Sequence, residues 1–171
     1  MTISNKWKKD KKTIGSANMV ALACDQGGFE LMRSVKQHLD AIGCEYKDFG
    51  TFTPDSCDYP TIAAPAAIAV AEGICDKGIF ICGTGIGVSI VANKTCGIRA
   101  ALCTNDFMAE KARKHNDANV LAMGGRVIDS DLAISIVDTF LDTPFSDSER
   151  HLRRVLMINE MDDMRCVASD K

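Results

Sequence analysis

Short apolar runs alternate along the chain with segments whose apolar residues recur at helical spacing. Four or more consecutive apolar residues bounded by turn residues are typical of buried strands. The sequence predicts five strands, at 19–24, 46–49, 78–82, 98–103 and 120–123. It predicts helices up to Gly43 and over 60–72, 87–94, 105–115 and 129–141, and a last helix that begins near Ser146.

The helix predicted over 129–141 has the clearest pattern. Its apolar residues fall on one face at i, i+3, i+4 and i+7 spacing. They are Leu132, Ala133, Ile136, Val137, Phe140 and Leu141. After it, the segment from Ser146 to Glu149 has the spacing of a capping box, which predicts that the last helix opens at Ser146.

The regular alternation of strand and helix decides the fold class. It predicts an α/β, doubly wound, Rossmann-like domain, with a five-stranded parallel sheet flanked by helices on both faces and a C-terminal helix. We assign this domain to residues 19–171 and treat residues 1–18 as a flexible basic extension. Ligands of such sheets bind at the carboxyl ends of the strands, so the residues around Cys24, Cys82 and Met123 are candidates for the site.

Composition and charge limit the kinds of partner that the protein is expected to bind. Of 171 residues, 46% are hydrophobic, and the formal net charge is -3, which argues against general binding to nucleic acid. Five lysines in the first twelve residues favour a solvated segment, with a nucleic-acid tail as the minor alternative. No apolar run has the length of a signal peptide or a membrane span, and the eight cysteines form no CxxC pair. We therefore expect a cytoplasmic location and cysteines that mostly pack as small apolar residues.

The stretch from Cys82 to Gly87 carries three glycines at alternate positions after a predicted strand. Glycine lets backbone amides approach a ligand, and a helix start supplies unpaired N–H groups, so the stretch predicts an anion cradle. Val88 stands where a dinucleotide motif needs its third glycine, which disfavours that ligand. The alternative anion is an oxyanion that forms during a reaction. Cys82 then acts as a base or nucleophile, or it is merely the last packed residue of the strand.

Basic residues supply a second candidate feature. Arg126 follows a Gly-Gly pair, and a cluster containing Arg150, His151 and Arg154 opens the last predicted helix. Arginine binds phosphate with a bidentate fork, although a solvated helix face has the same composition. His115 ends a predicted helix and could transfer protons near neutral pH, or simply interact with the helix dipole.

Several stretches taken in order resemble one family, the type B ribose-5-phosphate isomerases, whose relatives include galactose-6-phosphate and allose-6-phosphate isomerases. The resemblance extends from Met19 to Met161. The stretches that carry it are CDQGGF from Cys24, DYP from Asp58, ICGTGIG from Ile81, ANK from Ala92, GIRA from Gly97, HNDANV from His115, GR from Gly125 and RHLRR from Arg150.

The resemblance implies an intramolecular oxidoreductase that converts an aldose into a ketose through a cis-enediolate, without metal or cofactor. Cys82 would be the base that moves a proton between C2 and C1, and Thr84 would assist near the reacting oxygens. The amides of Gly83, Gly85, Ile86 and Gly87 would hold the enediolate oxygen.

Other roles implied by the resemblance concern the sugar and its phosphate. His115 would open the sugar ring, and Asp25 and Asn116 would position it. The phosphate would be held by Arg126, Arg150 and Arg154. The family forms homodimers, sometimes tetramers, with each active site built from two subunits. Because an open five-carbon phosphate spans about 8 Å, we expect the phosphate arginines to lie well away from the base.

One departure from the family concerns Gln26, where the family usually has histidine. Glutamine keeps hydrogen bonding and loses the possible charge, so Gln26 is expected to bind substrate and either to weaken phosphate binding or to alter sugar preference. The leading hypothesis is interconversion of ribose 5-phosphate and ribulose 5-phosphate, in the non-oxidative pentose phosphate pathway. The alternatives are a six-carbon substrate such as allose 6-phosphate or galactose 6-phosphate, and a non-catalytic protein that binds sugar phosphates.

Overall fold

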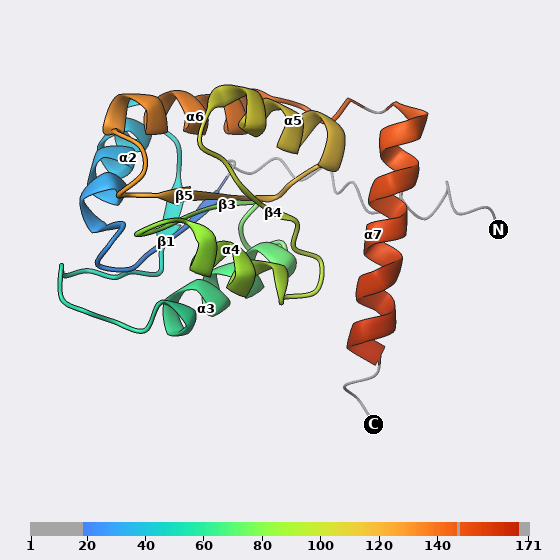
Figure 1. The fold of residues 1–171 in the computed structure, drawn as a ribbon, viewed down its shortest axis with the longest axis horizontal. Helices are drawn as coiled ribbons and strands as arrows, with labels where there is room; N and C mark the ends of the chain where they lie inside the picture. The colour runs from blue at the N-terminus through green and yellow to red at the C-terminus, as the bar shows by residue number, and fades with distance from the viewer. Residues whose placement is uncertain (1–18, 147, 168–171) are drawn as a thin grey trace.

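The computed structural model describes residues 19–146 and 148–167, so the predicted extension over 1–18 lies outside the described residues. Five parallel strands form one sheet in the order β2-β1-β3-β5-β4. Their bounds are Val20–Cys24 (β1), Tyr46–Asp48 (β2), Lys77–Cys82 (β3), Ala100–Leu102 (β4) and Val120–Gly124 (β5). The predicted five-stranded parallel α/β fold is thus confirmed (Figure 1).

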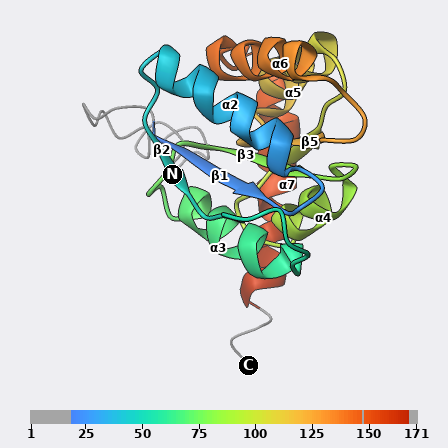
Figure 2. The same ribbon diagram turned by 90° about the vertical axis from the view of Figure 1, so that its left-hand side faces the viewer.

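Helices cover both faces of the sheet (Figures 1 and 2). One face carries α2 (Phe29–Ala41), α5 (Asp106–Asn116) and α6 (Ser130–Asp142), and the other carries α3 (Tyr59–Ala71) and α4 (Ile86–Asn93). Each face has its own core cluster, because alternate residues of β1 point to opposite sides: Leu22 packs in one cluster and Ala23 in the other. In the predicted amphipathic helix, Ala133, Ile136, Val137 and Phe140 are buried, which confirms its inward face.

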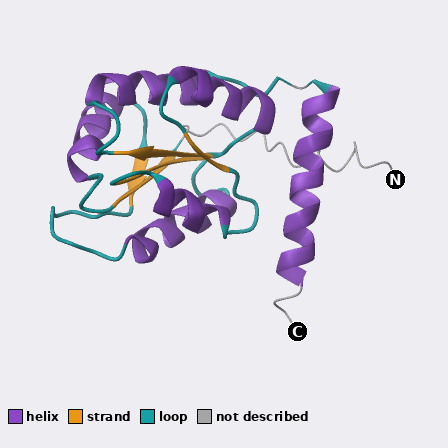
Figure 3. Ribbon diagram, in the orientation of Figure 1, coloured by secondary structure: helices purple, strands orange, loops and turns teal. Residues whose placement is uncertain are grey.

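The last helix, α7 (Glu149–Val167), stands beside the rest of the fold, next to the end of α5 (Figures 1 and 3). The predicted cap at Ser146 is wrong. The side chain of Ser148 accepts a hydrogen bond from the backbone amide of His151 at 3.4 Å, while the Ser146 hydroxyl lies 2.7 Å from Nδ1 of the His151 ring. Ser146 is therefore engaged with a side chain, and the helix starts two residues later than predicted.

The strand order creates one switch point, between β1 and β3. From β1 the chain moves to β2 on one side, and it then returns past β1 to β3 on the other side. The carboxyl ends of β1 and β3 are neighbours, with Cys24 paired to Ile81. The turns that follow these two strands therefore meet, which is where ligands of doubly wound sheets bind.

Within the described ranges, no helix has the length and apolar character needed to cross a membrane.

Candidate active site

Cys82 is the last residue of β3, and its side chain is buried. Its sulfur accepts a hydrogen bond from the backbone amide of Gly85 at 3.1 Å. Gly85 lies immediately before α4 with φ +78°, and a Cβ there would come within 2.5 Å of a Leu102 methyl and 2.8 Å of the Met123 carbonyl carbon. Only glycine fits, and its amide at the N-terminus of α4 points at the sulfur.

The turns after β1, β3 and β5 pack backbone against backbone, and we call them the three interlocked turns (residues 25–28, 83–85 and 124–126). A Cβ on Gly27 would lie 2.8 Å from the Cα of Gly83, and one on Gly125 would lie 2.5 Å from the Gly27 carbonyl oxygen. Gly125 also donates its amide to the Cys82 carbonyl at 2.8 Å. The surroundings of Cys82 are therefore built from main chain that has no room to move.

Asp25 is buried and serves the first of these turns. One oxygen of its carboxylate accepts hydrogen bonds from the amides of Gly27 at 2.8 Å and Gly28 at 3.1 Å. Gln26 also makes an internal contact, since its side-chain oxygen accepts from the backbone amide of Cys57 at 3.1 Å. Both residues lie at the predicted edge of the sheet, and both have partners within the chain.

Three more predicted residues surround Cys82. Thr84 and Ile86 are exposed at the mouth of the loop, and the Thr84 hydroxyl accepts from the Ile86 amide at 3.4 Å. Arg126 lies over the loop backbone, because a Cβ on Gly83 would meet its Nε and Cζ at 3.6 Å. The expectation that every phosphate arginine lies well away from Cys82 is therefore not met by Arg126.

The remaining predicted residues form a second group where α5 ends and α7 begins. The rings of His115 and His151 lie 4.2 Å apart between centroids, and Nη2 of Arg150 lies 3.3 Å from Nε2 of His151. The pKa of His151 is lowered from its usual 6.5 by burial first, then by His115, Arg150 and Arg154. Such a concentration of cationic and titratable groups suits a phosphate and a proton-transfer group.

A polar network ties this second group together. Asp117 follows His115 and Asn116 in the left-handed conformation, with φ 45°. Buried Arg113 donates to Oδ1 of Asp117 at 2.9 Å, and Arg99 donates to the Asp117 carbonyl at 2.8 Å. Arg99 also donates to the side chain of Asn159 on α7 at 3.1 Å. The network therefore fixes the end of α5 relative to α7.

The sequence reasoning missed the structural part played by Arg99, Arg113 and Asp117. Arg99 and Asp117 were inside stretches that carried the family resemblance, so a signal for them existed. Arg113 stands among other charged residues of a helix, and nothing in its spacing distinguishes it from a surface arginine.

The two groups lie at opposite edges of the sheet. Cys82 pairs with Gly124 at the carboxyl end of β5, whereas His115 and Asn116 precede Val120 at its amino end. Five residues of strand separate these ends by about 13 Å. The separation follows from the predicted order of elements. A helix that connects two parallel strands runs back to the amino ends of the strands, so the end of such a helix lies far from Cys82. One chain does not bring His115, Asn116, Arg150 and Arg154 to Cys82.

Other cysteines of the chain have structural surroundings. Burial raises the pKa of Cys24 and of Cys103 to about 11, so both remain protonated near neutral pH. Cys96 is disulfide-bonded and so departs from the expected packing role. Among the described residues, no group of three or more His, Cys, Asp or Glu side chains is arranged to hold a metal ion.

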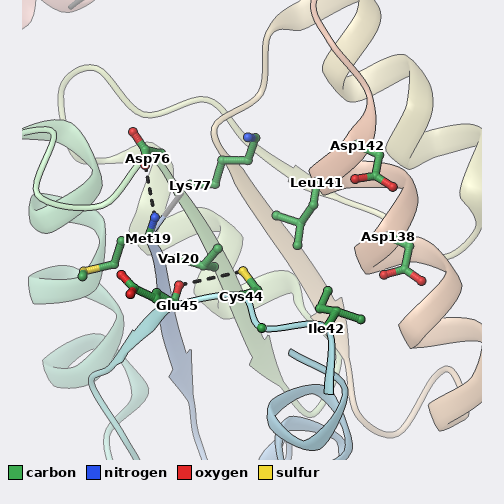
Figure 4. Close-up of a pocket in the computed structure, with 11 residues that line it drawn as sticks. Met19, Val20, Ile42, Cys44, Glu45, Asp76, Lys77, Asp138, Leu141 and Asp142 are labelled. Atoms are coloured by element: carbon green, nitrogen blue, oxygen red, sulfur yellow. Dashed lines mark hydrogen bonds between the residues drawn. The ribbon is translucent and has the colours of Figure 1, made fainter. Parts of the chain in front are cut away.

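Two cavities lie away from Cys82. One, of about 530 Å³, opens at the amino ends of β1 and β3 and is lined by Glu45, Asp76, Lys77, Asp138 and Asp142 among others (Figure 4). It contains none of the predicted site residues, and its acidic lining does not suit a phosphate. A groove of about 640 Å³ runs along β4 between α5 and α7 and includes Asn116.

Comparison with known proteins gives one consistent family. Residues 20–158 match the model of the family described as Ribose/Galactose Isomerase. The chain is 44% identical to ribose-5-phosphate isomerase B of Escherichia coli (strain K12) over 146 residues, which cover 85% of this chain and 97% of that protein.

A solved structure and a second relative extend the comparison. Ribose-5-phosphate isomerase B of Clostridium thermocellum superposes with a TM-score of 0.83 at 48% identity, covering 86% of this chain and 99% of that one. The 4-deoxy-4-sulfo-D-erythrose isomerase of Clostridium sp. (strain MSTE9) is 41% identical over 136 residues, or 79% of this chain and 86% of that protein. Similar sequences in this family therefore carry names with different substrates.

Proposed function

Since the chain belongs to the ribose/galactose isomerase family, we infer that it is an isomerase that interconverts D-ribose 5-phosphate and D-ribulose 5-phosphate. Relatives of that name are similar over nearly their whole length, which supports both the activity and the substrate. We propose in addition that Cys82 is the base. The observation that carries this assignment is the 3.1 Å hydrogen bond from the Gly85 amide to its sulfur, at the switch point of the sheet.

In the proposed reaction the Cys82 thiolate removes the proton from C2 of the open-chain aldose. The electron pair of that C–H bond forms the C1–C2 double bond, and the carbonyl electrons move onto O1. Amides in the first turn of α4 stabilise the negative oxygen. The thiol then returns the proton to C1 while the O2 proton is transferred to O1, so that C2 becomes the carbonyl carbon and C1 carries the hydroxyl of the ketose. C2 is oxidised and C1 is reduced within the same sugar molecule, so the reaction needs no redox cofactor.

His115, Asn116, Arg150 and Arg154 enter this scheme through a second copy of the chain. We propose a homodimer in which the carboxyl edge of one subunit faces the His115 group of its partner. Two observations support it: the groups are about 13 Å or more apart in one chain, and the groove beside Asn116 is lined by exposed Phe107, Ile158 and Met161. The phosphate would then bind between Arg126 of one subunit and the arginines of the other.

Mixing two inactive variants tests the shared site. Cys82→Ala and His115→Gln should each lower kcat by about 10²–10⁴, because each removes an acid–base group. When equal amounts are unfolded and refolded together, half of the dimers are mixed, and each mixed dimer has one intact site. About a quarter of the wild-type activity should therefore return. No recovery in verified mixed dimers would disprove a shared site, and full activity of Cys82→Ala alone would disprove the base.

A second candidate substrate class deserves a direct assay. The 41% identical relative named for a sulfonated four-carbon sugar, and the Gln26 departure, both favour testing substrates of other lengths. The decisive measurement is kcat/KM for ribose 5-phosphate, allose 6-phosphate, galactose 6-phosphate and 4-deoxy-4-sulfo-D-erythrose with one preparation. We expect the highest value for ribose 5-phosphate.

The proposal also covers the cellular location of the enzyme and its pathway. We propose that the enzyme works in the cytoplasm, in the non-oxidative pentose phosphate pathway. The names of its relatives support this setting. Loss of growth on a pentose after gene deletion, with rescue by wild type and no rescue by Cys82→Ala, is the expected result.

A further inference from the structure

The side chain of Gln26 faces the loop that follows β2. Its oxygen accepts a hydrogen bond from the backbone amide of Cys57 at 3.1 Å and a second from the Cys57 thiol at 3.5 Å. A backbone amide only donates, so the atom of Gln26 that faces it is the oxygen. Substrate binding by Gln26 stays a prediction, and its side-chain oxygen has a partner within the chain.

The loop in question, residues 52–58, is held differently at its two ends. Before it, main-chain bonds at 2.6 Å join Cys24 to Gly50 and Thr51 in both directions. Residues 52–56 are then exposed, and the next hydrogen bonds to the β1 side of the site come from Cys57 to Gln26. Asp58 is then held by α3, since Thr61 donates its amide at 3.0 Å and its hydroxyl at 2.8 Å to the Asp58 carbonyl. Gln26 is the side chain that ties Cys57 to the β1 side.

The anchor itself is rigid. Gln26 belongs to the turn that Asp25 fixes through two amides, and that turn packs against Gly83 without room for a methyl group. The group that Gln26 holds is close to the cradle. Cys57 is two residues before Tyr59, whose ring would lie 2.7 Å from a Cβ on Gly87. Cys57 therefore lies next to the start of α3, where Tyr59 packs on the first turn of α4.

We propose that Gln26 is a positioning residue that latches the 52–58 loop and thereby limits the length of sugar phosphate that the site accepts. The latch is argued from geometry alone, and the limit on sugar length rests on the proposed isomerase function. A latched loop keeps Tyr59 against the cradle, and a released loop lets the wall of the site move outward. Selectivity by a wall of this kind is worth about 10-fold for one extra carbon.

The latch can be measured without substrate. Gln26→Leu removes the acceptor, and amide hydrogen exchange of the 52–58 loop should become about 10-fold faster, most of all at Cys57. Gln26→Glu retains an acceptor and should keep the slow exchange. Gln37→Leu, an identical change at an exposed position of α2, is the control and should leave the loop unchanged. If Gln26→Leu fails to fold, Gln26→Ala removes the same acceptor.

Selectivity is measured with the same proteins. We expect the ratio of kcat/KM for ribose 5-phosphate over allose 6-phosphate to fall about 5–10-fold in Gln26→Leu, mainly through KM. Unchanged exchange at Cys57 would overturn the latch, even if KM rises, because Gln26 would then act by touching substrate. Faster exchange with an unchanged ratio would overturn the limit on length. If wild type converts neither sugar, the proposed function fails, while the exchange experiment still decides the latch.

Discussion

The two edges of the sheet are built in different ways. At the carboxyl edge, Cys82 is held by main chain: the interlocked turns leave no space for a methyl group, and an amide donates to its sulfur. At the amino edge, His115 depends on side chains, chiefly Arg99 and Arg113 with Asp117, and its neighbour α7 stands outside the body of the fold. From this difference we expect Cys82, the proposed base, to be insensitive to most side-chain changes, whereas the His115 group should be easily disturbed.

The largest effect is expected at the carboxyl edge, from Gly85→Ala. The new Cβ would need a positive φ and would overlap Leu102 and the backbone of Met123, so we expect about 3 kcal/mol of destabilisation and at least 100-fold lower kcat. Gly73→Ala is the matched control, because Gly73 has φ +72° and nothing within 4 Å of its Cβ position. The free energy of unfolding is measured by chemical denaturation, and kcat by a turnover assay. Equal effects of the two changes would mean that crowding at Gly85 is unimportant.

A smaller effect is expected at the amino edge, from Arg99→Leu. This change removes the donor to the Asp117 carbonyl and to the Asn159 side chain, and it should cost about 3 kcal/mol and lower kcat/KM by about 10–100-fold. Hydrogen exchange should quicken over 113–119 and stay unchanged over 82–88. Arg33→Leu, at an exposed ion pair, is the control. Faster exchange over 82–88 would show that the edges are not independent.

The amino edge should also respond to pH through His151. Its pKa in the folded protein is lowered, so the unfolded chain binds the proton more readily. The stabilisation is complete above pH 6.5 and is lost as the pH falls from 6.5 through the lower pKa of the folded protein. The drop in Tm from pH 8 to pH 5.5 should therefore be smaller in His151→Gln than in wild type. An identical drop in Tm in both proteins would show that His151 does not contribute to the pH dependence of stability.

The smallest effect is expected on the outer surface of α5, from Glu110→Gln. Hydrogen bonds from Lys111 and Lys114 lower the pKa of this carboxyl to about 2, so it stays ionised at neutral pH, and its contribution is lost only as the pH falls from 4.5 toward that value. The side chains involved are partly exposed, and solvent screens them. Turnover at pH 7 should not change, and a carboxyl NMR titration should give a midpoint near 2. A large loss of activity would mean that any change on α5 disturbs His115.

The sequence allowed most of the fold to be predicted, because hydrophobic periodicity marks each element. The predicted element boundaries were wrong where local contacts compete. The apolar run over 98–103 forms a strand only at Ala100–Leu102. The last helix is capped by Ser148 and not by Ser146. In the candidate site, the glycine pattern predicted the cradle around Cys82 and Gly85. The contact from Gln26 to Cys57 could not be found, because it joins residues 31 positions apart through one side chain whose direction is set by the turn beneath it.

The interlocked turns have a consequence for how such a protein can change over generations. Where three stretches of main chain meet with no spare volume, an inserted residue or a larger side chain in any one of them displaces the other two. New specificities would then have to arise from substitutions outside these turns, in the 52–58 loop or on the surface contributed by α5 and α7. The part of the molecule nearest the chemistry is, for this reason, the part least open to innovation.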